Sequence, residues 1–392
     1  MPLVLLALAC ATSATSPDPQ PATAPGPAAA VDLDDPATCS ACHAAVVREW
    51  NDSMHARAHH DRDPIHAGMR RMRMAKQGQA IAGQCAQCHT PRSPADVDAP
   101  AAKQGVSCAT CHAAAHVDLA AGKGAKALTW TEGTLLLGPH DLAAGASPVH
   151  GTGNAPAHLT DGTTLCMACH DATTTPTGAD ACTTGPEFRA AAATEGEAAR
   201  SCVACHMPRV EGPSGAVSTR ADHASHRFHG PHDAWHHDDP SFLAQAVDLR
   251  LTRAPSGTAT VTLANRSQHG FPTGFPGRMA VLVVEGFDAA GASVWRADDT
   301  VLNKVYVDGD GKPVPPPFSA KLDRDTRLTP NETRTLQFEP PATVASLEAR
   351  LVLRLLPPPM ASSLGLPADP ATAELAEPRL VASASWSPAP TR

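Results

Sequence analysis

The sequence predicts a two-domain protein: a mostly helical and loop-rich domain held together by cofactors, followed by an antiparallel β-sandwich of the immunoglobulin-like class. The pattern Cys-x-x-Cys-His occurs five times, and every copy lies between Thr38 and Arg209. Aromatic residues make up only 4 % of the 392 residues, so a core built from side chains alone would be poor in large apolar groups. From about residue 240 onward, apolar and polar residues alternate as they do in strands.

The chain begins with a short apolar run, residues 3–9, that ends at Cys10 and precedes a stretch rich in Pro, Ala, Ser and Thr. This pattern resembles a lipoprotein signal with Cys10 as the lipidation site. The alternative is an ordinary cleaved signal peptide. We expect residues 1–10 to be a signal segment and residues 11–36 to be a flexible linker. The protein is then exported, as a periplasmic or outer-membrane lipoprotein or at the cell surface, with a lipid anchor as its contact with the membrane.

Each Cys-x-x-Cys-His motif is the attachment site of one c-type haem. The two thiols bind the porphyrin, and the histidine becomes the proximal ligand of the iron. Zinc sites also use Cys-x-x-Cys pairs, but they do not need a histidine after every second cysteine. The sequence therefore predicts five c-type haems in a domain of residues 37–240. The thioether residues are Cys39, Cys42, Cys85, Cys88, Cys108, Cys111, Cys166, Cys169, Cys202 and Cys205, and the proximal ligands are His43, His89, His112, His170 and His206.

Helices in this domain are expected to be short. Asp63-Pro64 predicts a helix start, because proline is tolerated at the first helical position. Pro186 opens a second helical segment that runs into Cys202. Methionines and basic residues follow in the first of these helices. The methionines can serve as axial ligands but are better explained as a packed face, and the basic residues as a solvated face, with pairing to haem propionates or partner docking as the alternative. They are Met69, Met72, Met74, Arg70, Arg71, Arg73 and Lys76.

The last part of the chain, residues 241–392, contains no cysteine. Alternating apolar residues predict strands at 246–251, 258–263, 279–287, 333–338, 347–355 and 380–386. Turn signals at residues 288–291 and 308–311 separate some of them. The number and length of these strands predict the β-sandwich domain.

Near the first motif, Glu49-Trp50 is followed by Ser53-Met54-His55-Ala56. This element resembles the cytochrome c-554 family of multihaem cytochromes. Further matches lie at residues 105–107, 205–209, 226–228 and 269–274. The last of these resembles the His-x-Phe-Pro-Thr-Gly element of multihaem cytochromes that carry a C-terminal β-domain, although Gln268 stands where glycine is usual. The resemblance implies the architecture and electron transfer, but not the specific partner of the namesake, which has four haems and no β-domain.

Each iron needs a second, distal ligand, and its identity decides between an electron carrier and an enzyme. Five of the 20 histidines are proximal, which leaves 15 others. The family element suggests His55. The distal candidates are His55, His116, His150, His226 and His269, with His140, His158, His59 and His60 in reserve. Six histidines between residues 222 and 237 allow a soft divalent metal site as an alternative for that run.

Histidine on both sides saturates the iron, so we expect a relay of electrons rather than catalysis. The alternative is an oxidoreductase with one haem open to nitrite, hydroxylamine or a sulfur oxyanion. Related reductases often carry lysine in place of histidine in the motif of the active haem, whereas all five motifs here end in histidine. Hydroxylamine oxidoreductases also have a crosslinking tyrosine, but the single tyrosine here, Tyr306, lies in the strand region. A third possibility is a subunit of a larger extracellular cytochrome assembly. The formal charge of −8 argues against nucleic acid and favours redox partner proteins, whose identity the sequence leaves open.

Overall fold

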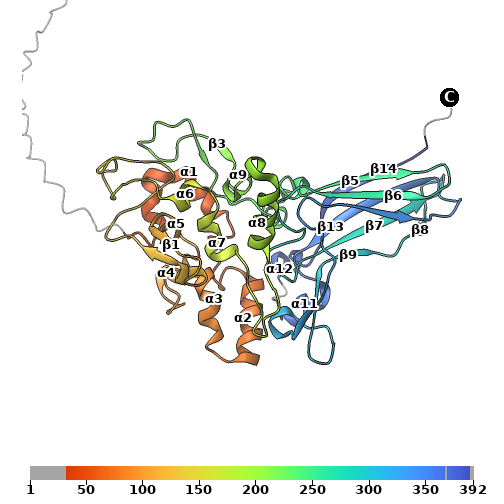
Figure 1. Ribbon diagram of the computed structural model, residues 1–392, viewed down its shortest axis with the longest axis horizontal. Coiled ribbons are helices and arrows are strands. Elements are labelled where there is room, and N and C mark those ends of the chain that lie inside the picture. The colour runs from red at the N-terminus through yellow and green to blue at the C-terminus, as the bar shows by residue number, and fades with distance from the viewer. Residues whose placement is uncertain (1–31, 367–368, 389–392) are drawn as a thin grey trace, which may run out of the picture. The chain divides into compact units, whose positions relative to one another are not determined.

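Short helices and loops make up the first part of the chain (Figure 1). The computed structural model describes residues 32–366 and 369–388. The chain divides into two units, Met1–Val31 and Asp32–Arg392, and only the second is described below. The expected signal segment, Cys10 and residues 11–31 of the expected linker lie outside the described residues. The expected domain boundary near residue 240 stays a prediction.

The helices of the first part are mostly one to three turns long. They are α1 (Ser40–Asn51), α2 (Pro64–Gln77), α3 (Ile81–His89), α4 (Pro100–Lys103), α5 (Cys108–His112), α6 (Ala157–Thr160), α7 (Thr164–His170), α8 (Thr184–Glu195), α9 (Cys202–His206) and α10 (Asp233–His236). Two small antiparallel ribbons accompany them, β1 (Ala114–Val117) with β2 (Leu128–Trp130) and β3 (Arg209–Glu211) with β4 (Asp222–Ala224). None of the helices in the described residues is long and apolar enough to cross a membrane.

The two predicted helix starts have different outcomes. Asp63 caps α2 as expected, because its carboxylate accepts hydrogen bonds from the N–H groups of Ile65 and His66, and Pro64 follows at the first helical position. The helix near Pro186 begins two residues earlier, at Thr184, and does not run on into Cys202. It stops because Gly196 adopts a positive φ of 59°, which ends the α-helix.

All six predicted strands are confirmed, and they pair antiparallel. One sheet has the order β12-β6-β5, and the other has the order β14-β13-β7-β8, with β9 also pairing with β7. A two-stranded ribbon, β10-β11, stands apart from both. The strands are β5 (Val247–Arg253), β6 (Ala259–Asn265), β7 (Met279–Phe287), β8 (Ser293–Arg296), β9 (Thr300–Leu302), β10 (Lys304–Val307), β11 (Lys321–Asp325), β12 (Thr333–Phe338), β13 (Ser346–Arg354) and β14 (Arg379–Trp386), and two short helices, α11 (Pro358–Ser363) and α12 (Pro370–Glu374), precede β14. The fold is thus a helical part with a β-part of open antiparallel sheets, whereas closure into an immunoglobulin-like sandwich stays a prediction.

The apolar core belongs mainly to the strands. Every second residue of β6 and β13 is buried, including Val261, Leu263, Leu347 and Leu351. The largest buried cluster that consists only of residues before β3 is small and contains three alanines and Leu128. Side chains alone therefore provide little packing in the helical part.

Replacing Leu263 with alanine tests the strand core. Leu263 is fully buried, so Leu263→Ala is expected to lower the free energy of unfolding by about 2–5 kcal/mol. Leu380→Ala is the control, since Leu380 is 48 % exposed and its truncation is expected to change stability by less than about 0.5 kcal/mol. Denaturant unfolding of both variants measures the difference, and equal effects would contradict this description of the core.

Candidate haem sites

The five motifs form helical turns that end at or near their histidines. Helices α3, α5, α7 and α9 each finish at the motif histidine. In the first motif, Cys39 precedes α1, and His43 interrupts the helix with non-helical angles. One helical turn places the two cysteines at positions i and i+3 and the histidine at i+4, so all three lie on the same face. Each motif can therefore present two thiols and one imidazole to the same cofactor.

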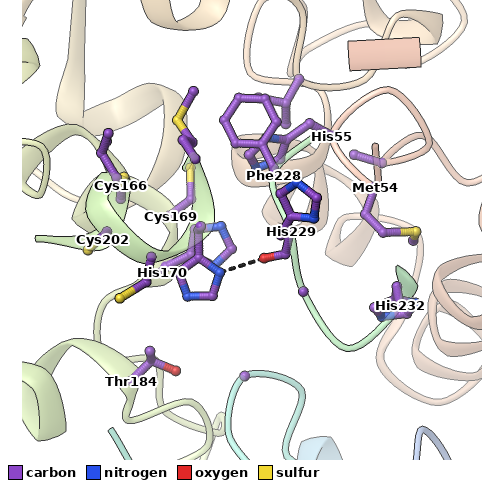
Figure 2. A pocket seen from close by; sticks show the side chains of 18 of the residues that line it. Met54, His55, Cys166, Cys169, His170, Thr184, Cys202, Phe228, His229 and His232 are labelled. Carbon is purple, nitrogen blue, oxygen red and sulfur yellow. Dashed lines mark hydrogen bonds between the residues drawn. The ribbon is translucent and has the colours of Figure 1, made fainter. Parts of the chain in front are cut away.

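These faces line one continuous cavity of about 2540 Å³. Its walls include nine of the ten motif cysteines and all five motif histidines. Figure 2 shows Cys166, Cys169 and His170 on one side of a part of this cavity, with His55 and Phe228 on the other. The cavity thus occupies the place where the helical part lacks a core.

Four of the five motif histidines are oriented by backbone carbonyls. When Nδ1–H donates to a carbonyl, the proton is fixed on Nδ1 and Nε2 is left free to bind a metal. The Nδ1–O distances are 2.6 Å from His43 to Ser214, 3.0 Å from His89 to Ala58, 2.6 Å from His112 to Leu137 and 2.6 Å from His206 to His229. These contacts prepare four motif histidines for coordination through Nε2.

Four motif histidines face a second histidine ring at a nearly constant distance. A metal–imidazole bond is roughly 2 Å long and the ring centre lies about 1 Å behind the nitrogen, so two imidazoles on one iron have centroids about 6 Å apart. The centroid distances are 6.5 Å for His43–His150, 6.2 Å for His112–His226, 6.2 Å for His170–His55 and 6.3 Å for His206–His269. Each pair is therefore spaced to hold one iron between its rings.

Three of these four opposing histidines also have Nδ1 close to a hydrogen-bond acceptor. The distances are 2.9 Å from His150 to the carbonyl of Gly151, 2.8 Å from His226 to that of Ala224, and 3.2 Å from His269 to that of Gly270. Two of the reserve histidines use Nε2 instead. His59 Nε2 lies 2.9 Å from the carbonyl of Val97, and His158 Nε2 lies 3.1 Å from that of Ala114. In His59 and His158 the Nε2 atom already has a hydrogen-bond partner, whereas His150, His226 and His269 have their hydrogen bonds at Nδ1.

Desolvation favours the neutral form of several of the facing imidazoles. Desolvation, together with neighbouring histidines, lowers the pKa of His55 to about 3 and the pKa of His170 and His226 to about 4. Desolvation lowers the pKa of His269 to about 4 as well. Neutral imidazole is the form that binds a metal ion, so these side chains fit axial ligation of haem iron at neutral pH.

His55 owes its position to a close backbone approach. Its carbonyl accepts a hydrogen bond of 3.0 Å from the N–H of Val106. Gly105 has a φ of +68°, and a Cβ atom there would lie only 2.6 Å from the carbonyl oxygen of His55. Trp50 contributes a hydrogen bond of 2.8 Å from Nε1 to the Val106 carbonyl. Two of the sequence elements that carry the family resemblance are therefore in contact, and they direct His55 toward the fourth motif rather than the first.

His269 is held by contacts between the two parts of the fold. Glu187 on α8 accepts hydrogen bonds from the N–H of Gly270 (2.9 Å) and from Arg327 (2.6 Å). The Arg327 and Glu187 side chains are only 10 % and 15 % exposed, so this ion pair is shielded from water. Glu187 thereby fixes the loop that carries His269 opposite His206.

The second motif differs from the others. The ring nearest to His89 is that of His66, which stacks on it at 3.8 Å rather than facing it at 6 Å. The remaining distal candidate, His116, is exposed on β1, and within the described residues it makes no ring contact with a motif histidine. Sequence reasoning missed His66. The sequence signal for His66 was its place in the first turn of α2, directly after the Asp63-Pro64 helix start.

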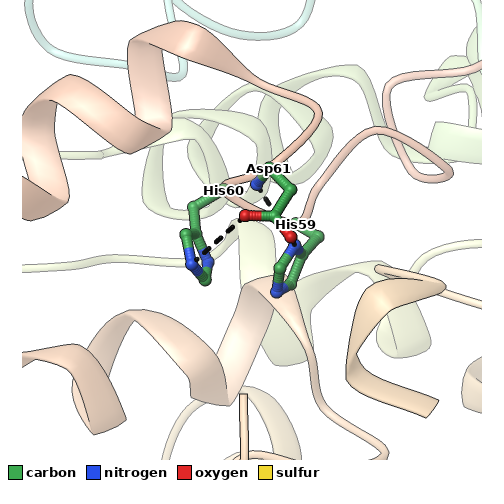
Figure 3. A group of neighbouring side chains, drawn as sticks. All are labelled: His59, His60 and Asp61. Atoms are coloured by element: carbon green, nitrogen blue, oxygen red, sulfur yellow. Dashed lines mark hydrogen bonds and ion pairs between the residues drawn. The ribbon is translucent and has the colours of Figure 1, made fainter. Parts of the chain in front are cut away.

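A separate group, His59, His60 and Asp61, brings three potential ligand atoms within 4.8 Å (Figure 3). His59 Nδ1 accepts from the N–H of Asp61, and its Nε2 is engaged by Val97. Both nitrogens of His59 are therefore used, which describes a hydrogen-bonded turn. The histidines of residues 222–237 form no comparable three-ligand group in the part of the chain that was described.

Comparisons with known proteins place the chain among multihaem cytochromes. Residues 38–113 match the family described as cytochrome c554 and c-prime. A solved penta-haem cytochrome c552 from Thermochromatium tepidum is 28 % identical, with a TM-score of 0.74, over 89 % of this chain and 97 % of that chain. No curated protein matches the chain. The chain is a multihaem c-type cytochrome that binds c-type haem and transfers electrons, while the expected likeness at residues 269–274 stays a prediction.

Glu187→Gln tests the placement of His269. Glutamine keeps a neutral acceptor but loses the charge opposite Arg327, so the variant is expected to lose about 1–3 kcal/mol of stability. It is also expected to make the haem at Cys202 and Cys205 partly high-spin, because the His269 loop is loosened. Denaturant unfolding and electron paramagnetic resonance measure the two effects.

The matched control is Glu197→Gln, which changes an exposed glutamate shortly after α8 and is expected to leave both readouts unchanged. His269→Ala sets the upper limit for the spectral change. A fully low-spin Glu187→Gln protein of wild-type stability would refute the role given to Glu187.

Proposed function

We propose that this cytochrome relays electrons through five covalently bound haems between a donor protein and an acceptor protein. The observation that carries the proposal is the set of four histidine pairs, each spaced for one iron, around a single cavity. An iron with imidazole on both sides has no position left for a substrate.

The attachment points of different haems adjoin, as a relay requires. Cys39 of the first motif lies within hydrogen-bonding reach of Cys108 of the third. Cys88 of the second motif reaches Cys169 of the fourth. Cys166 of the fourth motif reaches Cys202 of the fifth. These contacts support short distances between successive haems.

Haem supplies the redox chemistry, because its iron changes between the ferric and ferrous states. The residues of this chain position and tune it. The motif cysteines would fix each porphyrin, the paired histidines would occupy both free positions of the iron, and the carbonyls at Nδ1 would adjust the basicity of these histidines. The apolar walls of the cavity exclude water and so influence the reduction potentials.

The second motif is the place where the alternative function, an oxidoreductase with one open haem, finds support. His89 is the one motif histidine among the described residues with no ring facing it at about 6 Å. Nitrite, hydroxylamine or a sulfur oxyanion would bind at this iron if its sixth position were vacant. We favour the relay because four of the five sites have both rings in place.

We further propose that the protein is exported and held at a membrane by a lipid on Cys10, as a periplasmic, outer-membrane or cell-surface lipoprotein. The support is the sequence of residues 1–10 and the need to attach haem outside the cytoplasm. A chain with a formal charge of −8 fits redox partners with a basic docking face, and gives no basis for nucleic-acid binding.

Haem counting and redox titration test the relay. Pyridine haemochrome analysis and intact mass are expected to give five haems per chain, all reversibly reducible. The double variant Cys85→Ser and Cys88→Ser is expected to lose one haem. Cys182→Ser is the control, because Cys182 belongs to no motif, and it is expected to keep all five. Fewer than five haems in the wild type, or a haem fraction that is not reversibly reduced, would count against the proposal.

A further inference from the structure

Helix α2 turns one face toward the second haem site. His66, Arg70 and Arg73 are spaced i, i+4 and i+7, so they lie on the same side of the helix. All three line the cavity together with Cys85 and His89. Arg73 also reaches Cys85 with its side chain. This face therefore presents one imidazole and two positive charges to the place where the second haem would be attached.

One ring nitrogen of His66 is buried without a hydrogen-bond partner. Its Nδ1 lies 2.9 Å from the carbonyl oxygen of Ala58. Its Nε2 is inaccessible to solvent and has no hydrogen-bond partner. A buried polar atom without a partner costs about 1–3 kcal/mol, so a histidine is a poor choice here unless something binds that nitrogen.

The other four motif histidines provide the comparison for what could bind the Nε2 atom of His66. In each of them a second histidine ring faces the proximal ring at 6.2 to 6.5 Å. We propose that His66 is the distal ligand of the iron held by His89, an inference that rests on the proposed attachment of haem to Cys85 and Cys88. His66 is then the fifth distal histidine, in place of the exposed His116.

One movement is required. The rings of His66 and His89 now stack at 3.8 Å, and both Nδ1 atoms share the carbonyl of Ala58. Opposed ligation needs a centroid distance of about 6 Å, so the ring of His66 has to turn about its Cα–Cβ bond and leave Ala58 to His89. Two staggered rotamers of one side chain are enough for such a change.

Met69, one turn further along α2, is the competing ligand because it also lines the cavity. A thioether carries no hydrogen-bonding requirement comparable to that of an imidazole nitrogen, so burial of Met69 needs no further explanation. Arg70 and Arg73 support a haem at this place independently of the ligand, because guanidinium groups match the carboxylates of haem propionates.

The experiment compares the full-length holoprotein with His66→Ala, His66→Met, Met69→Leu and His116→Ala. Low-temperature electron paramagnetic resonance and magnetic circular dichroism count high-spin ferric haems. We expect none in the wild type and one of five in His66→Ala, returning to low spin when imidazole is added. Met69→Leu and His116→Ala are expected to match the wild type.

His66→Met keeps a possible iron ligand at the same position, so this variant tests the role of His66 even if the alanine variant does not fold. It is expected to stay fully low-spin, with a raised potential for one of the five haems in a redox titration. An unchanged His66→Ala or His66→Met protein, a high-spin haem in the wild type, or a high-spin haem produced by Met69→Leu would overturn the proposal. A haem count below five would instead refute the relay, so the two failures can be told apart.

Discussion

The helical part depends on histidine side chains that lie in pairs around one cavity. Motif histidines meet second histidines in pairs across this cavity, and several of them have Nδ1 beside a backbone carbonyl, which leaves Nε2 for a metal. The side chains around them supply only small apolar clusters. Haem attachment and folding would therefore be coupled, because porphyrins would fill the space that large apolar side chains occupy elsewhere and axial bonds would connect distant segments of the chain.

The β-part contributes to this arrangement directly. His269 comes from the loop after β6 and faces His206 of the fifth motif. The loop is fixed by Glu187 of α8, whose carboxylate is paired with Arg327 from the β-part. Because the strands carry most of the apolar core, they provide a packed support for the His269 loop. An electron carrier can thus obtain a precise axial position from a part of the chain that has no haem motif of its own.

The sequence was sufficient for the motifs, the capped start of α2 and six strands, since each depends on local spacing. It was not sufficient for the axial pairs. His55 follows the first motif but faces His170 of the fourth, a pairing that arises from the approach of Gly105 to the His55 backbone. His66 was missed because its position after the Asp63-Pro64 start of α2 does not by itself show that its Nε2 is buried. Strands β8 to β11 are too short to show an alternating pattern over several residues.

The contacts between motif cysteines define how the sites are connected. Cys169 of the fourth motif lies close to Cys88 of the second, and Cys166 of the fourth motif lies close to Cys202 of the fifth. If each of these cysteines attaches a haem, the fourth haem would adjoin two others, and the arrangement would be branched rather than linear. A branched circuit can store several electrons and deliver them through more than one exit, so the order of the motifs along the chain need not be the order of electron flow.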